Sequence, residues 1–501
     1  MPGDQHSEAA NVTDASLTGL RKAPTGIAGL DDLTGGGLPQ GRSTLVCGPA
    51  GCAKTLLAME FLVRGVRQFD EPGVFVSFEE TVDDLVTNFA SLGFDLAGAE
   101  RAGELVIDHI YVGRGEADTS GEWDLDGLFL RLAAAIDAVG AKRVAIDTLE
   151  NLFGAFPHTA ILRAEMHRLF GWLKDRGVTS VITAERGDGT LTRHGIEEYV
   201  SDCVITLDHR VIEQASTRRL RVLKYRGSAH GTNEYPFLIT EAGLSVLPIT
   251  SHDLSYQVST ERISTGTPSL DAMLGGQGPY KGSTLLVSGG AGTGKSIMAA
   301  AFCDAACRRG DRAMYFSFEE SPPEFLRNTN SIGLNLEQWI DGGLLQVHSL
   351  RPNMLGLEAH LFTIKSLVEL WSPAVLVKDP ISSLTGFGTK AEVAFLFTRQ
   401  IDFLKSRGIT TVLTSVTDEL DSALQLQGLG SLVDTWIRIQ RKTTDGTSAR
   451  LLQIVKSRGV SHSDAVAELH ISDRGIEIAE PRAGAAPHQG GQVSDRHEAE
   501  A

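Results

Sequence analysis

The chain has 501 residues, more than one hydrophobic core usually organises, and its 42% hydrophobic and 22% charged residues are typical of globular domains. It has no apolar run of bilayer-spanning length, so we expect no membrane segment. The net charge of −17 opposes a surface that binds nucleic-acid phosphates, so we expect no nucleic-acid partner.

The chain begins with a polar segment, residues 1–16, which we expect to be disordered. This segment lacks the basic and then apolar pattern of a secretory signal. The five cysteines are scattered without a CxxC pair, which favours a reducing compartment. Together these features predict a cytoplasmic protein.

From residue 17 to residue 247, short β-rich runs alternate with amphipathic stretches. Strand, helix and strand at this spacing predict βαβ units. We therefore expect an α/β domain with a mainly parallel central sheet flanked by helices. The predicted strands are residues 43–48, 73–78, 143–147 and 178–185, and the predicted helices are residues 55–69 and 162–177.

A glycine-rich loop, "GPAGCAKT", joins the first predicted strand to the first predicted helix. In such a loop the backbone N–H groups point at phosphate oxygens, the lysine adds positive charge and the hydroxyl can ligate Mg²⁺. Alanine stands before the lysine instead of glycine, which is tolerable only if the dihedral angles there suit a non-glycine residue. The predicted nucleotide-binding residues are Gly48, Gly51, Cys52, Ala53, Lys54 and Thr55, of which Thr55 is also a predicted metal ligand.

Acidic residues follow two further predicted strands of this domain. Glu79 and Glu80 come after the strand at 73–78, and one of these carboxylates could orient or deprotonate an attacking hydroxyl. The alternative is an acidic pair that merely starts a helix. Asp147 ends the apolar run at 143–147, at the sheet edge beside the loop, where it could hold Mg²⁺. We predict Glu79 and Glu80 as catalytic residues and Asp147 as a metal ligand.

The second half of the chain repeats the first half in the same order. The segment 25–55 recurs as 265–296, and its loop lysines lie 241 residues apart. "VFVSFEE" recurs as "MYFSFEE" at a spacing of 240, and Asp147 recurs as Asp379 at a spacing of 232. Collinear matches at near-constant spacing indicate a duplicated domain. We therefore expect a second α/β domain at 262–480, a linker at 248–261 and a disordered tail at 481–501.

The second loop, "GGAGTGKS", fits the full G-x-x-x-x-G-K-[ST] pattern between a predicted strand and a predicted helix. It is therefore a more complete nucleotide-binding motif than the first loop. Glu319 and Glu320 repeat the acidic pair and are predicted catalytic residues. The predicted nucleotide-binding residues are Gly289, Gly292, Thr293, Gly294, Lys295 and Ser296, and the predicted metal ligands are Ser296 and Asp379.

Both halves also contain a K-x-R-G-x-x-H stretch, at 224–230 and 456–462. With the two loops, the two F-E-E segments and "EEYVSD" at 197–202, these stretches make the chain similar to the KaiC family of circadian clock ATPases. That family belongs to the RecA/DnaB-like P-loop proteins, and the likeness runs from about residue 17 to residue 473. The resemblance implies ATP and Mg²⁺ as cofactors and a homohexamer of double rings, with nucleotide between neighbouring subunits.

The resemblance also implies that the basic residues of these stretches reach the nucleotide of the adjacent subunit, as an arginine finger does. An isolated subunit would then lack part of its own site. The alternative is that they are ordinary surface residues on a strand. They are Lys224, Arg226 and His230 in the first domain and Lys456, Arg458 and His462 in the second.

The family is a serine/threonine autokinase and autophosphatase that modifies adjacent serine and threonine residues in its second domain. The matching stretch, "GLGSLVDTWI", places Gly430 and Ser431 at those positions, so one acceptor is missing. The resemblance implies that Ser431 is the phosphoacceptor, with a base such as Glu319, and a merely structural serine is the alternative. Tyr199 matches Ser431 in the first copy, which favours hydrolysis in the first domain and regulation in the second.

Between the acidic pair and the metal aspartate, the first domain is eight residues longer, in a loop at 113–125. The corresponding region of the family's first ring engages the partner KaiB. We therefore expect either a KaiB-like partner or a merely solvent-exposed loop at this position. The tail has no counterpart of the family's KaiA-binding segment, so we expect no KaiA-type activator.

Three functions remain open from the sequence. The favoured one is a hexameric ATPase and autokinase that acts as a circadian-clock-type or signalling switch. A RecA-like or helicase-like DNA-dependent ATPase is opposed by the net charge and would show salt-sensitive stimulation by DNA. A scaffold that uses ATP only for assembly would keep its low turnover in Glu79→Gln. ATP and GTP are not distinguished by any residue pattern.

Overall fold

The structure is a computed structural model that describes residues 19–111, 125–150, 159–187, 201–212, 215–247, 258–351, 356–384, 386, 389–417, 427–444 and 447–479. The chain divides into two compact units, Met1–Thr250 and Ser251–Ala501. Several predicted features lie outside the described residues. They are the terminal segments 1–16 and 481–501, most of the linker, residues 113–124 of the extra loop and residues 197–200 of "EEYVSD".

Within the described residues, the first unit has a nine-stranded sheet in the order β11, β10, β9, β8, β3, β7, β6, β4, β5. The strands from β5 to β8 are parallel, and β9, β10 and β11 add to the sheet in antiparallel fashion. The strand bounds are β3 (Ser43–Gly48), β4 (Gly73–Ser77), β5 (Leu105–His109), β6 (Arg143–Asp147), β7 (Thr179–Glu185), β8 (Cys203–Ile212), β9 (Ala215–Tyr225), β10 (Tyr235–Thr240) and β11 (Gly243–Val246).

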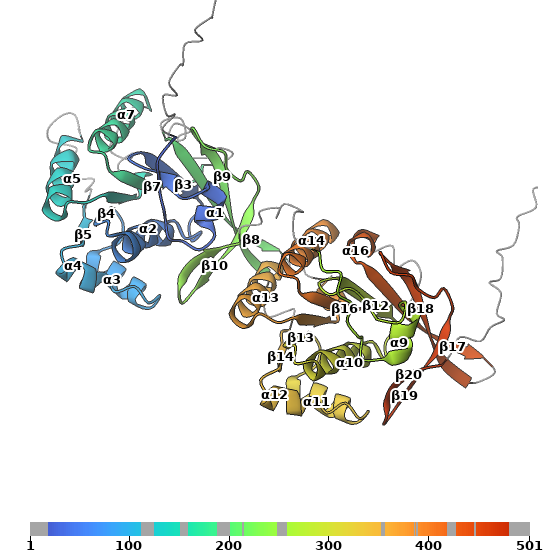
Figure 1. Cartoon of the computed structure of the whole chain (residues 1–501). Helices are drawn as coiled ribbons and strands as arrows, with labels where there is room; N and C mark the ends of the chain where they lie inside the picture. Colours follow the sequence, from blue (N-terminus) through green and yellow to red (C-terminus); the bar gives the residue numbers. More distant parts are fainter. Residues whose placement is uncertain are drawn as a thin grey trace, which may run out of the picture. The chain divides into compact units, whose positions relative to one another are not determined.

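Helices cover both faces of this sheet (Figure 1). Phe75 of β4 packs in one core cluster with residues of the helix that follows the first loop, while Val74 and Val76 pack in a second cluster. Burial on both faces explains why the central strands are continuous apolar runs. The helices are α1 (Leu30–Thr34), α2 (Lys54–Phe69), α3 (Val82–Ala90) and α4 (Leu96–Arg101), and on the opposite face α5 (Asp126–Val139) and α7 (Thr159–Asp175). The short strands β1 (Lys22–Ala23) and β2 (Leu38–Pro39) form a separate pair.

The second unit repeats this topology. Over the described part of the chain, its nine strands are in the order β14, β13, β15, β16, β12, β17, β18, β19, β20. The strands are β12 (Thr284–Gly289), β13 (Ala313–Ser317), β14 (Leu345–Ser349), β15 (Val375–Asp379), β16 (Thr410–Val416), β17 (Thr435–Thr444), β18 (Thr447–Ser457), β19 (Ala467–Ser472) and β20 (Gly475–Ile478). The helices are α9 (Pro268–Met273), α10 (Lys295–Arg308), α11 (Pro322–Asn330), α12 (Glu337–Asp341), α13 (Leu357–Trp371), the short 3₁₀ helix η2 (Ile381–Leu384), α14 (Lys390–Ser406) and α16 (Gln427–Leu432).

The predicted fold class is confirmed: two tandem α/β domains each have a mainly parallel sheet with helices on both faces. The strands predicted at 43–48 and 143–147 have the observed bounds of β3 and β6. The antiparallel hairpins β8–β9 and β17–β18, which extend each sheet, were not predicted. Their residues mix polar and apolar side chains, so they lack the continuous apolar runs that identify the central strands in the sequence.

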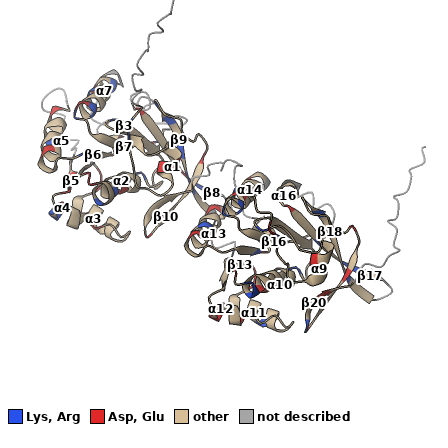
Figure 2. Ribbon diagram, in the orientation of Figure 1, with Lys and Arg blue, Asp and Glu red and all other residues tan. Residues whose placement is uncertain are grey.

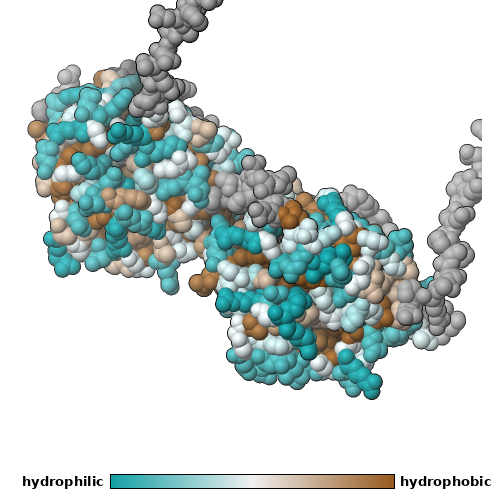
Figure 3. Space-filling view, viewed as in Figure 1, coloured by the Kyte–Doolittle hydropathy of each residue, from teal (hydrophilic) through white to brown (hydrophobic). Residues whose placement is uncertain are grey.

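Charged and apolar side chains are distributed over both units. Lys and Arg are interspersed with Asp and Glu along the described elements (Figure 2). The drawn surface is mostly hydrophilic with small hydrophobic areas (Figure 3). Exposed apolar side chains include Leu130 on α5, Leu370 on α13 and Phe395 on α14, and scattered residues of this kind are normal on a protein surface. No helix in the described part of the chain is long and apolar enough to cross a membrane.

Candidate functional site

The two predicted phosphate-binding loops lie at the carboxyl ends of β3 and β12, and the lysine of each loop begins the next helix. The Lys54 ammonium donates hydrogen bonds of 3.0 Å to the carbonyls of Gly48 and Pro49, and Lys295 donates one of 2.7 Å to the carbonyl of Gly290. Both lysines are buried. Each loop therefore curls around a lysine at a helix N-terminus, an arrangement suited to a polyphosphate.

Ala53 does not meet the condition under which alanine would be unstrained in this loop. Its φ of 78° and ψ of 32° are left-handed, as is the φ of 101° at the matching Gly294. A left-handed conformation costs a non-glycine residue about 1–2 kcal/mol. The methyl group is nevertheless accommodated in the first domain, where Ala53 packs against the hydrophobic core. At Gly294, a Cβ would lie 2.4 Å from Ile471 Cδ1, so alanine fits the first loop better than the second.

Asp147 lies at the end of β6 and is tied to the first loop. Thr55 Oγ1 donates a hydrogen bond of 2.8 Å to Asp147 Oδ2, and Thr183 of β7 donates to Oδ1. Burial raises the pKa of Asp147, and the two hydroxyl donors oppose this effect. The two predicted metal ligands of the first domain, Thr55 and Asp147, are therefore brought together.

Asp379 lies at the matching end of β15 with a different partner. Thr414 of β16 donates to Asp379 Oδ1, as Thr183 does in the first domain, but the hydroxyl of Tyr315 donates to Oδ2 at 2.6 Å. Ser296, the second predicted ligand, makes no hydrogen bond to Asp379 among the described residues. The second domain therefore places both predicted ligands at the loop edge without joining them.

The donor set at these aspartates fits Mg²⁺. A carboxylate and a loop hydroxyl are hard oxygen ligands, and Mg²⁺ in nucleotide sites usually takes one or two carboxylates and completes its shell with phosphates and water. Among the described residues, no group of three or more His, Cys, Asp or Glu side chains could hold a metal by itself.

The two glutamates of each acidic pair have different surroundings. Glu80 accepts a hydrogen bond of 3.0 Å from Asn88 of α3, and Glu320 accepts one of 3.1 Å from Asn328 of α11. Partial burial raises the pKa of Glu320. The second glutamate of each pair is thus bound to the helix that follows it.

The first glutamate of each pair faces the segment after the aspartate that is the predicted metal ligand. Glu319 accepts a hydrogen bond of 2.7 Å from Ser383 of η2, and Glu79 accepts a longer one of 3.4 Å from Thr148. Both glutamates are exposed at the loop edge of the sheet. Glu79 and Glu319 are therefore better placed than Glu80 and Glu320 to act on a hydroxyl or water near the predicted metal ligand.

The predicted trans-acting basic residues lie at the opposite end of the strands from the loop of the same domain. The loops follow the carboxyl ends of β3 and β12, and the basic residues lie near the amino ends of these strands. Ser457 of β18 pairs with Thr435, which pairs with Leu285 near the start of β12. Gly289, where the loop begins, is four residues further along β12, or about 13 Å at the rise of a strand. The same register holds for Tyr225, Cys203 and Thr44 in the first domain. These residues are therefore remote from their own phosphate-binding loops.

At that end the basic residues contact their own chain. Lys224 Nζ donates a hydrogen bond of 2.8 Å to the carbonyl of Ser201, and Arg226 lies 3.6 Å from the carboxylate of Asp202. His230 Nδ1 lies 3.3 Å from the carbonyl of Ser228, and His462 makes the matching contact with Val460 at 3.3 Å.

In the second domain, the same residues hold the helix that carries the predicted phosphoacceptor. Lys456 Nζ donates to the carbonyl of Gly430, and Arg458 Nη2 donates to the carbonyl of Ser431 at 2.6 Å. Ser431 is exposed on α16, directly before β17. It therefore lies at the end away from Glu319 of its own chain, so the expectation that Glu319 serves it cannot apply within one subunit.

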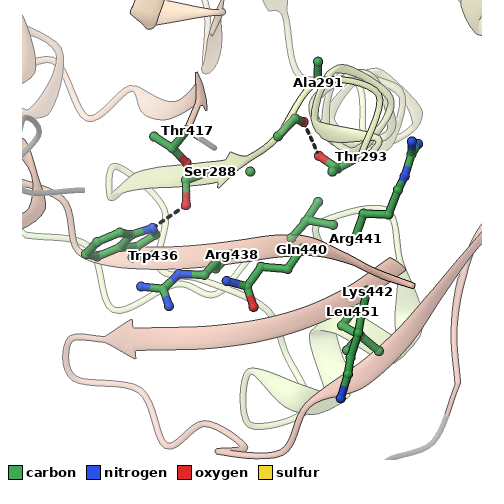
Figure 4. A pocket seen from close by; sticks show the side chains of 13 residues that line it. Ser288, Ala291, Thr293, Thr417, Trp436, Arg438, Gln440, Arg441, Lys442 and Leu451 are labelled. Carbon is green, nitrogen blue, oxygen red and sulfur yellow. Dashed lines mark hydrogen bonds between the residues drawn. The ribbon is translucent and has the colours of Figure 1, made fainter. Parts of the chain in front are cut away.

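A cavity of about 570 Å³ adjoins the second loop, between the loop and β17 (Figure 4). Trp436 Nε1 donates a hydrogen bond of 2.8 Å to Ser288 Oγ, and Arg441 donates one of 3.1 Å to the carbonyl of Gly292. Arg438 and Lys442 also line the cavity, so three cationic side chains including Arg441 border it.

Sequence reasoning missed Thr183, Thr414 and Tyr315, which donate hydrogen bonds to the aspartates predicted as metal ligands. Thr183 and Thr414 occupy the fifth position of β7 and β16, so a position-by-position comparison of the two copies would have selected them. Tyr315 would have stood out as a hydroxyl where the first copy has Phe75.

Comparisons with known proteins agree with the duplicated architecture. A family model described as "ATPase: KaiC" matches residues 23–251 and again residues 263–483. The chain is 51% identical over 473 residues to the circadian clock protein KaiC2 of Synechocystis sp., covering 94% of this chain and 83% of that protein. It is 37% identical over 464 residues to the circadian clock oscillator protein KaiC of Synechococcus elongatus, covering 92% and 89%.

Proposed function

Because the chain belongs to the KaiC family of ATPases, we propose that it is a cytoplasmic, ATP- and Mg²⁺-dependent switch of the circadian-clock or signalling type. In this proposal, subunits form a homohexameric double ring, the first domain hydrolyses ATP, and the second domain is an autokinase and autophosphatase at Ser431. The relatives described above are named as circadian clock proteins, which supports the choice of a timing function.

The observation that supports the proposal is that the proposed acceptor and the proposed base lie at opposite ends of the strands of one sheet. Ser431 and Arg458 lie at one end, while Glu319 and the loop lysine Lys295 lie at the other. A head-to-tail contact between identical subunits joins unlike ends, and it makes a ring if the rotation closes. Such a contact would bring Ser431 of one subunit to the nucleotide of the next.

The proposed transfer then uses groups from two subunits. Glu319 of the neighbouring subunit accepts the proton of Ser431 Oγ, which attacks the γ-phosphorus of ATP. The new bond joins Oγ to phosphorus, the bond from phosphorus to the β–γ bridging oxygen breaks, and ADP leaves with that electron pair. Lys295 and the Arg458 that arrives with Ser431 neutralise the charge on the phosphates. Mg²⁺, when bound at Asp379 and Ser296, would further offset this charge.

The first domain is proposed to hydrolyse ATP by the same arrangement with water as the nucleophile. Glu79 is the proposed base, Thr55 and Asp147 are the proposed Mg²⁺ ligands, and Lys224 and Arg226 would serve the adjacent subunit. The matching residue for Ser431 is Tyr199, which lies outside the described residues. A KaiB-like partner, if it binds, is proposed to bind the extra loop at 113–125.

A complementation experiment tests the transfer between subunits. A Lys295→Ala chain keeps the acceptor but lacks the loop lysine, and a Ser431→Ala chain keeps the loop but lacks the acceptor. With γ-labelled ATP and Mg²⁺, each chain alone should remain unlabelled at position 431. When the two chains are mixed before ATP is added, the Ser431→Ala chain should transfer label to Ser431 of the Lys295→Ala chain. A size tag on one chain lets mass spectrometry assign the label to its chain.

The outcomes separate the competing functions. A mixture that stays unlabelled while the wild type is labelled would exclude transfer between subunits. A wild type that releases phosphate without any label would leave a ring ATPase without the phosphorylation switch. Hydrolysis that depends on added DNA would favour the RecA-like or helicase-like DNA-dependent ATPase.

A further inference from the structure

The metal aspartates of the two domains differ in the partner of one carboxylate oxygen. In the first domain, Oδ2 of Asp147 accepts a hydrogen bond of 2.8 Å from Thr55 of the phosphate-binding loop. In the second domain, Oδ2 of Asp379 accepts one of 2.6 Å from the phenol of Tyr315. The same oxygen is therefore bonded to the loop in one domain and to the core of the sheet in the other.

The phenol is an addition to an otherwise matched position. Tyr315 is the third residue of β13, and Phe75 is the third residue of β4. Both strands pair in the same register with the strand that ends in the metal aspartate, and both side chains are fully buried. The position therefore differs between the domains by one hydroxyl group.

Tyr315 is held in place as a hydrogen-bond donor. Its ring packs on Phe325 of α11 with a centroid distance of 4.2 Å. With the ring fixed in this way, the phenol oxygen lies 2.6 Å from Asp379 Oδ2 and donates its hydrogen bond to that carboxylate.

We infer that Tyr315 is a positioning residue that weakens Mg²⁺ binding by the second domain relative to the first. The inference rests on the proposed function, because it assumes that Asp379 and Ser296 hold Mg²⁺ together with ATP. In the first domain, Thr55 and Asp147 are bonded to each other, so the two ligands are held together before the cation binds. In the second domain, the phenol donates its hydrogen bond to the carboxylate oxygen that would otherwise orient the loop hydroxyl.

The consequence is a difference in Mg²⁺ requirement within one chain. The first domain fills with Mg²⁺ at a lower concentration, and the second domain responds over a higher range. A change in free Mg²⁺ between these ranges alters the second domain while the first remains saturated. The proposed kinase domain thereby becomes the Mg²⁺-responsive half of the protein.

The test is a titration with Mn²⁺, followed by electron paramagnetic resonance of the free ion, on the full chain saturated with ADP. The wild type should show two classes of site with different affinities. Tyr315→Phe, which restores the first-domain residue, should tighten the weaker class by about fivefold, the effect of one hydrogen bond of typical strength. The matched variant Phe75→Tyr should weaken the tighter class by a similar factor.

Two further measurements exclude a general loss of structure. Removing the phenol takes a donor from a buried carboxylate, so Tyr315→Phe should melt at a lower temperature without metal and regain more of that loss when Mg²⁺ and ADP are added. ADP binding without a divalent cation should be unchanged. Unchanged or weaker Mn²⁺ binding by Tyr315→Phe, or equal affinity of both wild-type sites, would overturn the inference. A wild type that binds no Mn²⁺ with nucleotide would instead refute the proposed function.

Discussion

Arg458 donates a hydrogen bond of 2.6 Å to the carbonyl of Ser431, which links the predicted trans-acting arginine directly to the helix that carries the predicted phosphoacceptor. Lys456 makes the same kind of contact one residue earlier, with Gly430. Any contact that draws these side chains to a neighbouring nucleotide must therefore either break these hydrogen bonds or carry α16 along. In the proposed ring, these two hydrogen bonds would couple nucleotide binding in one subunit to the position of Ser431 in the next.

The coupling predicts the effect of Arg458→Ala. Loss of the guanidinium should reduce labelling of Ser431 by about 10³-fold, as for other arginines that act in trans on a phosphoryl group. Mass spectrometry after incubation with γ-labelled ATP would measure it. Arg226→Ala is the matched control, because it should lower phosphate release while labelling of Ser431 persists. Equal labelling in Arg458→Ala and the wild type would contradict the assigned role.

Within each acidic pair, we expect only the first glutamate to be essential. Glu319→Gln should reduce Ser431 labelling by about 10²–10⁴-fold, the usual contribution of a general base. Glu320→Gln should have a much smaller effect, because that carboxylate is bound to Asn328. Glu79→Gln and Glu80→Gln should show the same contrast in phosphate release. Similar losses in both members of a pair would indicate that the pair acts as a unit.

Strain at Ala53 predicts a stabilising substitution. Ala53→Gly should raise the free energy of unfolding of the first domain by about 0.5–1 kcal/mol, because relief of the left-handed strain exceeds the added flexibility of the unfolded chain. Gly294→Ala should do the opposite and cost about 2 kcal/mol or more, because its Cβ would also meet Ile471. Denaturant titration without nucleotide measures both changes. A destabilised Ala53→Gly would show that the methyl contact matters more than the strain.

Much of this architecture is accessible from the sequence because the repeat labels its own functional positions. Two copies of a glycine loop, an acidic pair and a strand-terminal aspartate predict where the chemistry lies on a parallel sheet. The sequence could not show that Lys456 and Ser431 lie at the end away from Lys295. That fact depends on the register between β12, β17 and β18, which is a long-range pairing with a bulge between Trp436 and Ile437.

The contact of Asp379 with Tyr315 was equally hidden. Spacing along the chain does not reveal which face of β13 meets which oxygen of a carboxylate on the next strand. The strain at Ala53 is a different case. The glycine motif shows that alanine stands where glycine is usual, but the left-handed backbone of Ala53 is visible only in the structure.

Space beside Gly430 predicts that a second phosphoacceptor can be introduced. A Cβ added there would lie 3.5 Å from the Trp436 ring, an ordinary van der Waals distance, and Gly430 does not have a left-handed backbone. Gly430→Ser should therefore fold normally and carry a second label beside Ser431. Peptide mapping would resolve the two sites, and Gly430→Ala controls for the added bulk. Label that stays confined to Ser431 would show that the transfer geometry selects one position.

The core of the second domain contains a buried lysine where the first domain has an apolar residue. Lys378 of β15 is fully buried and donates to Gln400 Oε1 on α14, with its ammonium 4.6 Å from the ring centroid of Phe397. The matching residues of the first domain are Ile146 and Leu169, both buried. Burial lowers the pKa of Lys378 from 10.5 to about 7.

This shift predicts how stability depends on pH. Between about pH 7 and pH 10.5, the unfolded chain holds the lysine proton and the folded chain does not. The contribution of Lys378 to the free energy of unfolding therefore rises with pH in this range. The double variant Lys378→Ile with Gln400→Leu reproduces the first-domain pairing and should be more stable than the wild type near pH 7, with the difference shrinking as the pH rises. Denaturant titrations from pH 7 to pH 9.5, in chelator and without nucleotide, measure this, and Lys442→Met controls for loss of an exposed lysine. A constant difference across this range would mean that Lys378 stays charged in the folded protein.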